Sequence, residues 1–332
     1  MSKLSSDGQA TLDKGLLFGA AAYGIWGLFP LYWRLLDNVG AVEALAHRFV
    51  WALVICVVLL RIRPRAGWWR ELRQRPEALR FLAVAAVVIA FNWYLYIWGV
   101  HHARVVETSL GYFISPLVTV MLGVLLFRER LRRPQWLAIC LAVAAVAWLT
   151  FDYGRVPWVA IGLALTFATY GVLKKKAATG AVESLAVEAT IIMPFTLGYL
   201  VWLDLVGRAA FVHAGWSTTL LLIAAGPATA IPLLFFAGAA TRIPLTYLGL
   251  LQYLTPSIQF LLGIFVFHEP MPPARLAGFV LIWTALAIFS GETLHHLRKL
   301  RRQARRLTAE PPPPAEPPRA EQRRSTAPPA RA

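Results

Sequence analysis

Apolar runs of about 20 residues recur along this chain with short polar gaps, and this recurrence most constrains its fold. A helix that rises 1.5 Å per residue needs about 20 residues to cross a hydrocarbon core of about 30 Å. The chain is 58% hydrophobic and 15% charged, whereas soluble proteins are about 25% charged. The sequence therefore predicts an all-α integral membrane protein that has the lipid bilayer as a partner.

Ten spans are predicted from the lengths of the runs and from the charges, prolines and glycines that end them. They cover residues 15–36, 41–60, 81–100, 104–127, 134–151, 156–174, 184–206, 218–238, 244–267 and 274–293. The gap 61–80 carries seven arginines and the gap 128–133 carries four, while the gaps on the opposite side carry about one each. The positive-inside rule then predicts that both termini are cytoplasmic. Because the net charge of +16 gathers in these loops and the tail, we expect no nucleic-acid partner.

Three segments flank the spans. Residues 1–14 are expected to be a cytoplasmic N-terminus, and "AGWWRELRQRPEALR" predicts an interfacial helix at about 66–77. Residues 298–332 are basic and rich in proline, so we expect a disordered cytoplasmic tail.

The second half of the chain repeats the first at an offset of 140 residues. "PLVTVMLGVLLFRE", which begins at Pro116, aligns with "PSIQFLLGIFVFHE" from Pro256, and "AVEALA" at Ala41 aligns with "AVESLA" at Ala181. Each repeat, 15–151 and 156–293, holds five spans, and an odd number makes the second repeat enter the membrane from the opposite side. Inverted repeats place a substrate site near the bilayer midplane and expose it alternately to each side.

The segments "WGLFPLY", "HRFVW" and "LGYFISPL" carry a resemblance to a known family. Over about residues 14 to 296, the chain resembles the EamA transporters of the drug/metabolite transporter superfamily, and most specifically the RarD subfamily. The resemblance implies ten helices, a bacterial inner-membrane location and a role as a permease. Small multidrug exporters of the superfamily have an acid in their first helix, but span 15–36 has none, so proton-coupled drug antiport through such an acid is not expected.

Arg48 and Glu188 are the candidates for the centre of a substrate site. They occupy equivalent positions in the two repeats, each about 10 Å into its span from opposite sides. A charged group inside a span costs at least about 2.5 to 3.5 kcal/mol, so it normally faces the protein interior, a partner or water. We hypothesise that both face one central cavity and pair directly, through water or through substrate. The alternative is a structural ion pair that fixes helix packing. Glu43, within a turn of the outer interface, could simply be solvated there.

Further polar and aromatic side chains are candidates for the same cavity. His47 could relay protons, although a hydrogen-bonded packing role is the commoner one, and Asn92 needs partners for its amide. Of five aromatic residues in the first and third spans, two or three are expected to touch substrate, and the rest to face lipid or core. Pro116 and Pro256 are expected to kink their helices, as hinges or as static bends. The full set of cavity candidates is Arg48, Glu188, His47, Asn92, Trp26, Tyr23, Trp93, Tyr96, Tyr112, Gln252, Tyr253 and Gln259.

The leading hypothesis is a secondary transporter that exports a small metabolite or drug-like molecule by alternating access. No GxxxxGK[ST] segment is present, so a coupling proton or ion, or substrate exchange, would drive transport. One alternative is a membrane scaffold or sensor without transport. A second is a membrane enzyme, but HExxH and GxSxG motifs are both absent. We expect no enzymatic activity, no cofactor, no metal site, and a monomer or weak homodimer.

Overall fold

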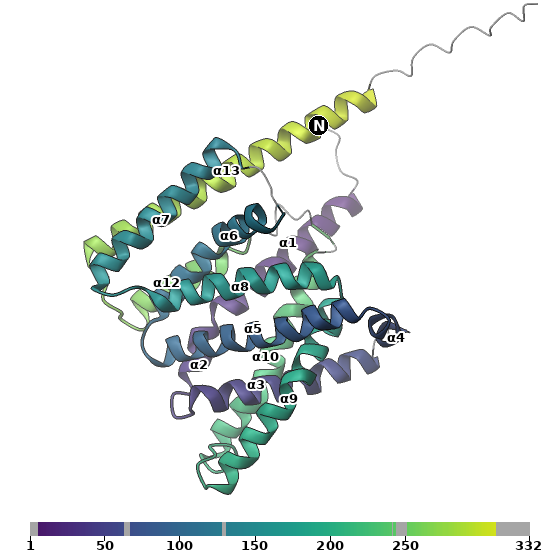
Figure 1. The fold of residues 1–332 in the computed structure, drawn as a ribbon, viewed down its shortest axis with the longest axis vertical. Helices are drawn as coiled ribbons and strands as arrows, with labels where there is room; N and C mark the ends of the chain where they lie inside the picture. The colour runs from purple at the N-terminus through teal and green to yellow at the C-terminus, as the bar shows by residue number, and fades with distance from the viewer. Residues whose placement is uncertain (1–5, 63–66, 128–130, 241, 244–250, 310–332) are drawn as a thin grey trace, which may run out of the picture. The chain divides into compact units, whose positions relative to one another are not determined.

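The computed structural model describes residues 6–62, 67–127, 131–240, 242–243 and 251–309 (Figure 1). All regular structure in these residues is helical, as the sequence predicts. The chain divides into two compact units, residues 1–290 and 291–332. All packing described below lies within the first unit.

The helices fall into two halves of the chain. The first half contains α1 (Ser6–Gly27), α2 (Phe29–Arg34), α3 (Ala41–Ile62), α4 (Trp68–Arg73), α5 (Pro76–His101), α6 (Val105–Phe127) and α7 (Arg133–Tyr153). The second half contains α8 (Trp158–Ala177), α9 (Ala181–Leu205), α10 (Trp216–Ala240), α12 (Leu254–Phe265) and α13 (Pro273–Ala309). The short helix α4 lies within the range predicted for an interfacial helix.

Eight helical segments in the described residues are long and apolar enough to cross a membrane. They are Leu12–Arg34, Ala41–Ile62, Pro76–His101, Val105–Leu122, Arg133–Tyr153, Ala181–Leu205, Trp216–Ala239 and Pro273–Glu292. The two other predicted spans, 156–174 and 244–267, correspond to α8 and to the region that contains α12. Helix α8 has three lysines in its last turn, and α12 has 12 residues.

The predicted first span is broken in two. Helix α1 ends at Gly27 and α2 begins at Phe29, with Leu28 between them. Pro30 explains the break, because proline lacks a backbone N–H and its ring clashes with the carbonyl four residues earlier. Helix α2 packs against α5, and its Phe29 and Trp33 lie beside Arg48 of α3.

The two prolines predicted as kinks have different positions. Pro116 lies inside α6, as expected for a kink. Pro256 lies in the first turn of α12, where a backbone N–H would have no hydrogen-bond partner within the helix. Pro256 therefore stands near a helix start, and the kink predicted there stays a prediction. The rest of that span, residues 244–250, lies outside the described residues.

Helix α13 extends further than predicted. The tail was expected to be disordered from residue 298, but α13 continues to Ala309. The segment "LRKLRRQARRLTA" consists largely of residues with high helix propensity, whereas the prolines from Pro311 onward cannot continue a helix. Residues 310–332 lie outside the described residues.

Eight helices pack as a ring in which the two halves of the chain alternate. The principal packing pairs run from α1 to α10, α3, α9, α5, α8, α6, α12 and back to α1. Figure 1 shows part of this order, with α8 between α6 and α5. Neighbouring helices in the ring therefore come from opposite halves of the chain.

Small residues allow close helix contacts in the ring. A Cβ atom on Gly226 of α10 would lie 2.6 Å from the backbone oxygen of Trp51 in α3. Only glycine permits this approach of the two backbones.

Helices α7 and α13 are not members of the ring. They lie side by side (Figure 1) and share an apolar core with α6 and α12. The rings of Phe260 in α12 and Phe279 in α13, for example, have centroids 4.7 Å apart. The polar interior must therefore be sought within the ring of eight.

Candidate substrate site

The guanidinium of Arg48 is buried among aromatic rings inside the helix ring. Arg48 is 4% exposed, and its Cζ lies 3.7 Å from the ring centroid of Trp93 in α5. The centroids of Phe29 and Trp33 in α2 are 5.4 and 5.5 Å away. Nε donates a hydrogen bond of 3.1 Å to Oγ1 of Thr229 in α10. We call Arg48, Phe29, Trp33, Trp93 and Thr229 the Arg48 cluster.

Tyrosine hydroxyls form the next polar layer around this cluster. Tyr32, Tyr96 and Tyr112 are the titratable groups that interact electrostatically with Arg48. Gln259 of α12 donates hydrogen bonds to the hydroxyl of Tyr96, at 3.1 Å, and to the carbonyl of Trp26, at 3.3 Å. Helices α12 and α5 are not neighbours in the ring, so the Gln259–Tyr96 bond crosses the interior.

No carboxylate neutralises Arg48 within the described residues. The guanidinium makes one side-chain hydrogen bond and no ion pair there. A charge inside a membrane span costs at least about 2.5 to 3.5 kcal/mol, and a desolvated cation–π contact offsets about 2 kcal/mol of this. The site therefore keeps a net positive character.

Glu188 is fully buried and has its own partners. Lys174 Nζ of α8 lies 2.8 Å from Glu188 Oε1, and the hydroxyl of Tyr170 donates to Oε2 at 3.0 Å. Lys174 also donates to the hydroxyl of Ser184. The charge of Glu188 is thus matched by the Lys174 ammonium and by one hydroxyl donor, Tyr170.

Arg48 and Glu188 do not pair directly. Glu188 is bound by Lys174 and Tyr170, whereas Arg48 donates to Thr229. Trp93 packs on Phe49, next to Arg48, and also on the apolar cluster that contains Cys56.

Asn92, His47 and Glu43 lie apart from the Arg48 cluster. Asn92 Nδ2 donates to Oγ1 of Thr166, at 2.8 Å, and to the carbonyl of Leu163, at 3.2 Å, so it joins α5 to α8. His47 stacks on the ring of Phe211, with centroids 4.7 Å apart, and its buried Nε2 has no partner. Glu43 is 4% exposed rather than solvated.

Of the remaining aromatic and amide candidates, some lie near Arg48 and others lie elsewhere. The rings of Trp26 and Tyr23 meet edge to face, with centroids 5.4 Å apart, and both pack on Phe236. Tyr253 packs against the apolar core shared by α6, α7, α12 and α13, and Gln252 is half-buried in the turn before α12. Trp93, Tyr96, Tyr112 and Gln259 therefore gather around Arg48, and Trp26 joins them through its carbonyl.

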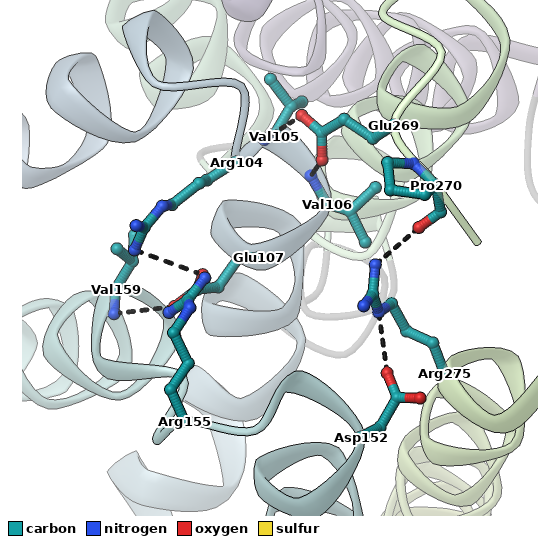
Figure 2. A network of polar contacts seen from close by, with 10 residues as sticks. All are labelled: Arg104, Val105, Val106, Glu107, Asp152, Arg155, Val159, Glu269, Pro270 and Arg275. Atoms are coloured by element: carbon teal, nitrogen blue, oxygen red, sulfur yellow. Dashed lines mark hydrogen bonds and ion pairs between the residues drawn. The ribbon is translucent and has the colours of Figure 1, made fainter. Parts of the chain in front are cut away.

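A second polar network lies where α5 meets α6 (Figure 2). Glu269, before α13, accepts hydrogen bonds from the backbone N–H groups of Val105 and Val106 at 2.5 and 2.8 Å. These are orphan donors at the start of α6, where a carboxylate is favoured. Burial raises the pKa of the Glu269 carboxyl, and the two N–H groups only partly offset this.

Ion pairs extend this network. Glu107 is paired with Arg155, at 2.7 Å, and more weakly with Arg104, at 3.9 Å. Arg275 Nε lies 2.9 Å from Asp152 Oδ2, and its Nη1 donates to the carbonyl of Pro270. We call Arg104, Glu107, Asp152, Arg155, Glu269 and Arg275 the Glu107 network; Figure 2 shows its contacts.

Several functional candidates were missed from the sequence. Lys174, at the end of the predicted span 156–174, was not singled out, and neither were Phe29, Trp33 and Thr229. Glu269 was recognised as part of the repeat, which was a usable signal for its importance. Thr229 had no such signal, because threonine is common in apolar helices.

The chain is similar to proteins named as transporters. The EamA-like transporter family matches residues 13–151. Protein RarD from Streptomyces exfoliatus is 51% identical over 287 residues, which cover 86% of this chain and 91% of that protein. An uncharacterized transporter from Pseudomonas aeruginosa is 44% identical and covers 88% of this chain, with 98% of its own length matched.

A solved crystal structure shares the fold. It has a TM-score of 0.53 and 18% sequence identity, and it covers 82% of this chain and 96% of its own.

Proposed function

Because this chain belongs to the EamA-like transporter family, within its RarD group, we propose that it is a secondary transporter that exports a small metabolite or drug-like molecule. The family makes it a multi-pass membrane transporter. We propose further that it transports by alternating access across the bacterial inner membrane, without an enzymatic step.

The Arg48 cluster is the observation that carries this proposal. Arg48 and Trp93 come from the first half of the chain, whereas Thr229 and Gln259 come from the second. A site shared between two halves changes its contacts when one half moves against the other, as alternating access requires. We therefore assign substrate binding to this cluster, with Tyr96, Tyr112 and Gln259 beside it.

The alternation of halves around the ring supports an inverted-repeat architecture. We propose two five-helix repeats, 15–151 and 156–293, in which α8 and the α12 region complete ten spans. Both termini then lie in the cytoplasm, because the arginine-rich gaps lie on their side. The Glu107 network lies at the outer end in this orientation.

We propose that this outer end is closed in the present structure. Glu269 of the second half holds the start of α6 in the first half, and Glu43 accepts hydrogen bonds from the backbone of Ala210, at 2.7 Å, and Phe211. Asn38 also donates to Thr218 at 3.1 Å. Opening toward the outside would have to break these contacts between the halves.

Efflux from proteoliposomes tests the proposal. Vesicles that contain the purified chain are loaded with a small-molecule cell extract, and mass spectrometry follows each compound that leaves under an ion gradient or in exchange. We expect a subset of compounds to leave faster than from protein-free vesicles. If no compound leaves faster under any gradient or exchange condition, the transporter proposal is wrong.

A reversible cross-link separates alternating access from a passive leak. In the double variant Asn38→Cys/Thr218→Cys, a short reducible thiol cross-linker should stop efflux, and a reductant should restore it. Each single variant, treated in the same way, is the matched control and should keep its efflux rate. Unchanged efflux in the cross-linked double variant would contradict outer opening.

A further inference from the structure

The charge balance around Arg48 indicates what kind of molecule the site accepts. Within the described residues, the titratable groups that interact with its guanidinium are tyrosine hydroxyls and no carboxylates. The buried acids of α3 and α9, Glu43 and Glu188, already have partners. Glu43 is bonded to backbone N–H groups, and Glu188 is paired with Lys174.

The guanidinium also has donors to spare. Within the described residues its hydrogen bond is the one that Nε donates to Thr229. Neither Nη atom donates a hydrogen bond to another described residue. A guanidinium offers parallel N–H groups that match the two oxygens of a carboxylate.

The surroundings select the remainder of the ligand. The faces of Trp93, Phe29 and Trp33 line the guanidinium, and the rings of Tyr96 and Tyr112 lie with centroids 5.8 Å apart beside it. Aromatic walls favour a flat apolar group. A cationic or zwitterionic ligand would find no free carboxylate for its ammonium group among these described residues.

We propose that the Arg48 cluster binds a small organic monoanion, whose carboxylate docks on the guanidinium and whose flat apolar part packs among the aromatic rings. This inference rests on the proposed function, because it names the substrate class of the same site. It separates this transporter from one that selects cationic drugs or amino acids.

Binding of matched probes to the full chain in lipid nanodiscs tests the charge selection. The probes are 3-phenylpropionate, its neutral amide, 3-phenylpropylamine, phenylalanine and propionate. We expect 3-phenylpropionate to bind about 10- to 100-fold more tightly than the amide, the size of a charge-assisted hydrogen bond. The amine, the zwitterion and the ringless acid should all bind more weakly. The dianion 2-phenylethylphosphonate should bind no tighter than the carboxylate, because one guanidinium faces it.

Variants place the effect at Arg48. Arg48→Gln should remove the preference for the acid over the amide, and Arg48→Lys should keep only part of it. The matched control is Arg61→Gln, an exposed arginine on the same helix, which should bind like the parent. If Arg48→Gln does not fold, as judged by its thermal unfolding, the acid-to-amide ratio of the parent chain still decides.

Two outcomes overturn the inference: equal binding of the acid and its amide, or a preference for the acid that survives in folded Arg48→Gln. The efflux assay distinguishes failure of this inference from failure of the proposed function. Efflux of neutral compounds alone would contradict the charge selection but not the transporter proposal. Binding of 3-phenylpropionate at Arg48 without efflux of any compound would support the inference and contradict transport.

Discussion

Arg48 and Glu188 occupy the same place in the two halves of the chain, each seven residues after the first residue of its helix, yet their surroundings differ. Glu188 has a cation at 2.8 Å and a tyrosine hydroxyl at 3.0 Å. Arg48 has aromatic faces, one threonine hydroxyl and no carboxylate within the described residues. The difference suggests that Glu188 stabilises the fold, whereas Arg48 is kept for a ligand.

The two buried charges should contribute differently to the free energy of unfolding. A buried pair that loses one member leaves an uncompensated charge and destabilises the protein. A buried charge that already lacks a counter-ion costs stability while it is present. Removal of Glu188 and removal of Arg48 should therefore have unequal effects on the free energy of unfolding.

The largest effect on stability is expected at Glu188. Glu188→Leu leaves the half-buried Lys174 without its partner, and the free energy of unfolding should fall by about 3 to 5 kcal/mol. Reversible unfolding in mixed micelles measures it. The double variant Lys174→Met/Glu188→Leu should recover most of the loss. The control Asp204→Asn, at an exposed ion pair on the same helix, should change stability by less than about 1 kcal/mol. No recovery in the double variant would contradict a structural pair.

Arg48→Met should lower the free energy of unfolding by less than about 2 kcal/mol, since the loss of a desolvated cation–π contact is offset by removal of an unpaired buried charge. The same unfolding experiment measures it beside Glu188→Leu. A loss as large as that of Glu188→Leu would show that Arg48 is as well compensated as Glu188, and the comparison would fail.

A smaller effect is expected from Gln259, which ties α12 to α5 and α1 across the ring. Gln259→Leu removes both donated hydrogen bonds and also the unpaired Oε1. The free energy of unfolding should therefore fall by about 1 kcal/mol. Gln259→Glu is the sharper variant, because it supplies the carboxylate that Arg48 lacks. Binding of 3-phenylpropionate should weaken in Gln259→Glu, and unchanged binding would contradict a shared site.

The smallest effect concerns Glu269 and external pH. Burial raises the pKa of its carboxyl in the closed form, so the closed form binds a proton more tightly than an open, solvated form. Lowering the external pH toward the ordinary pKa of a glutamate should then favour closure and slow efflux. Efflux from Glu269→Gln should lose this dependence, while Asp37→Asn, at an exposed ion pair, should keep it. Faster efflux at low pH in the parent chain would reverse the sign of this effect.

The sequence singles out Arg48 and Glu188 but not every side chain that surrounds them. Arg48 and Glu188 stand out because ionisable residues are rare inside apolar runs, and the repeat shows that they are equivalent. Lys174 could not be predicted as the partner of Glu188. Apolar residues occur on every face of most of α8, so their pattern does not show which of its three lysines faces the interior. The position of Phe29 and Trp33 beside Arg48 depends on the break between α1 and α2. Pro30 signals that break, but the direction of α2 after it depends on packing against other helices.

The sequence shows which loop residues are charged, but not which of them form ion pairs. Arg34, Arg104, Arg155 and Arg275 were counted singly as the few cations of one side. In the structure each has an acid partner at that end. The pairing depends on which loops of the two halves meet, and an orientation rule based on charge counts contains no such information.

The most direct test of the central claim compares the two equivalent positions in one transport measurement. Proteoliposomes that contain Arg48→Met or the double variant Lys174→Met/Glu188→Leu are assayed side by side for exchange of labelled 3-phenylpropionate, with the parent chain as reference. The account predicts that exchange is lost in Arg48→Met and retained in the double variant. Exchange that persists in Arg48→Met but disappears in the folded double variant would contradict it and assign the ligand to Glu188 instead.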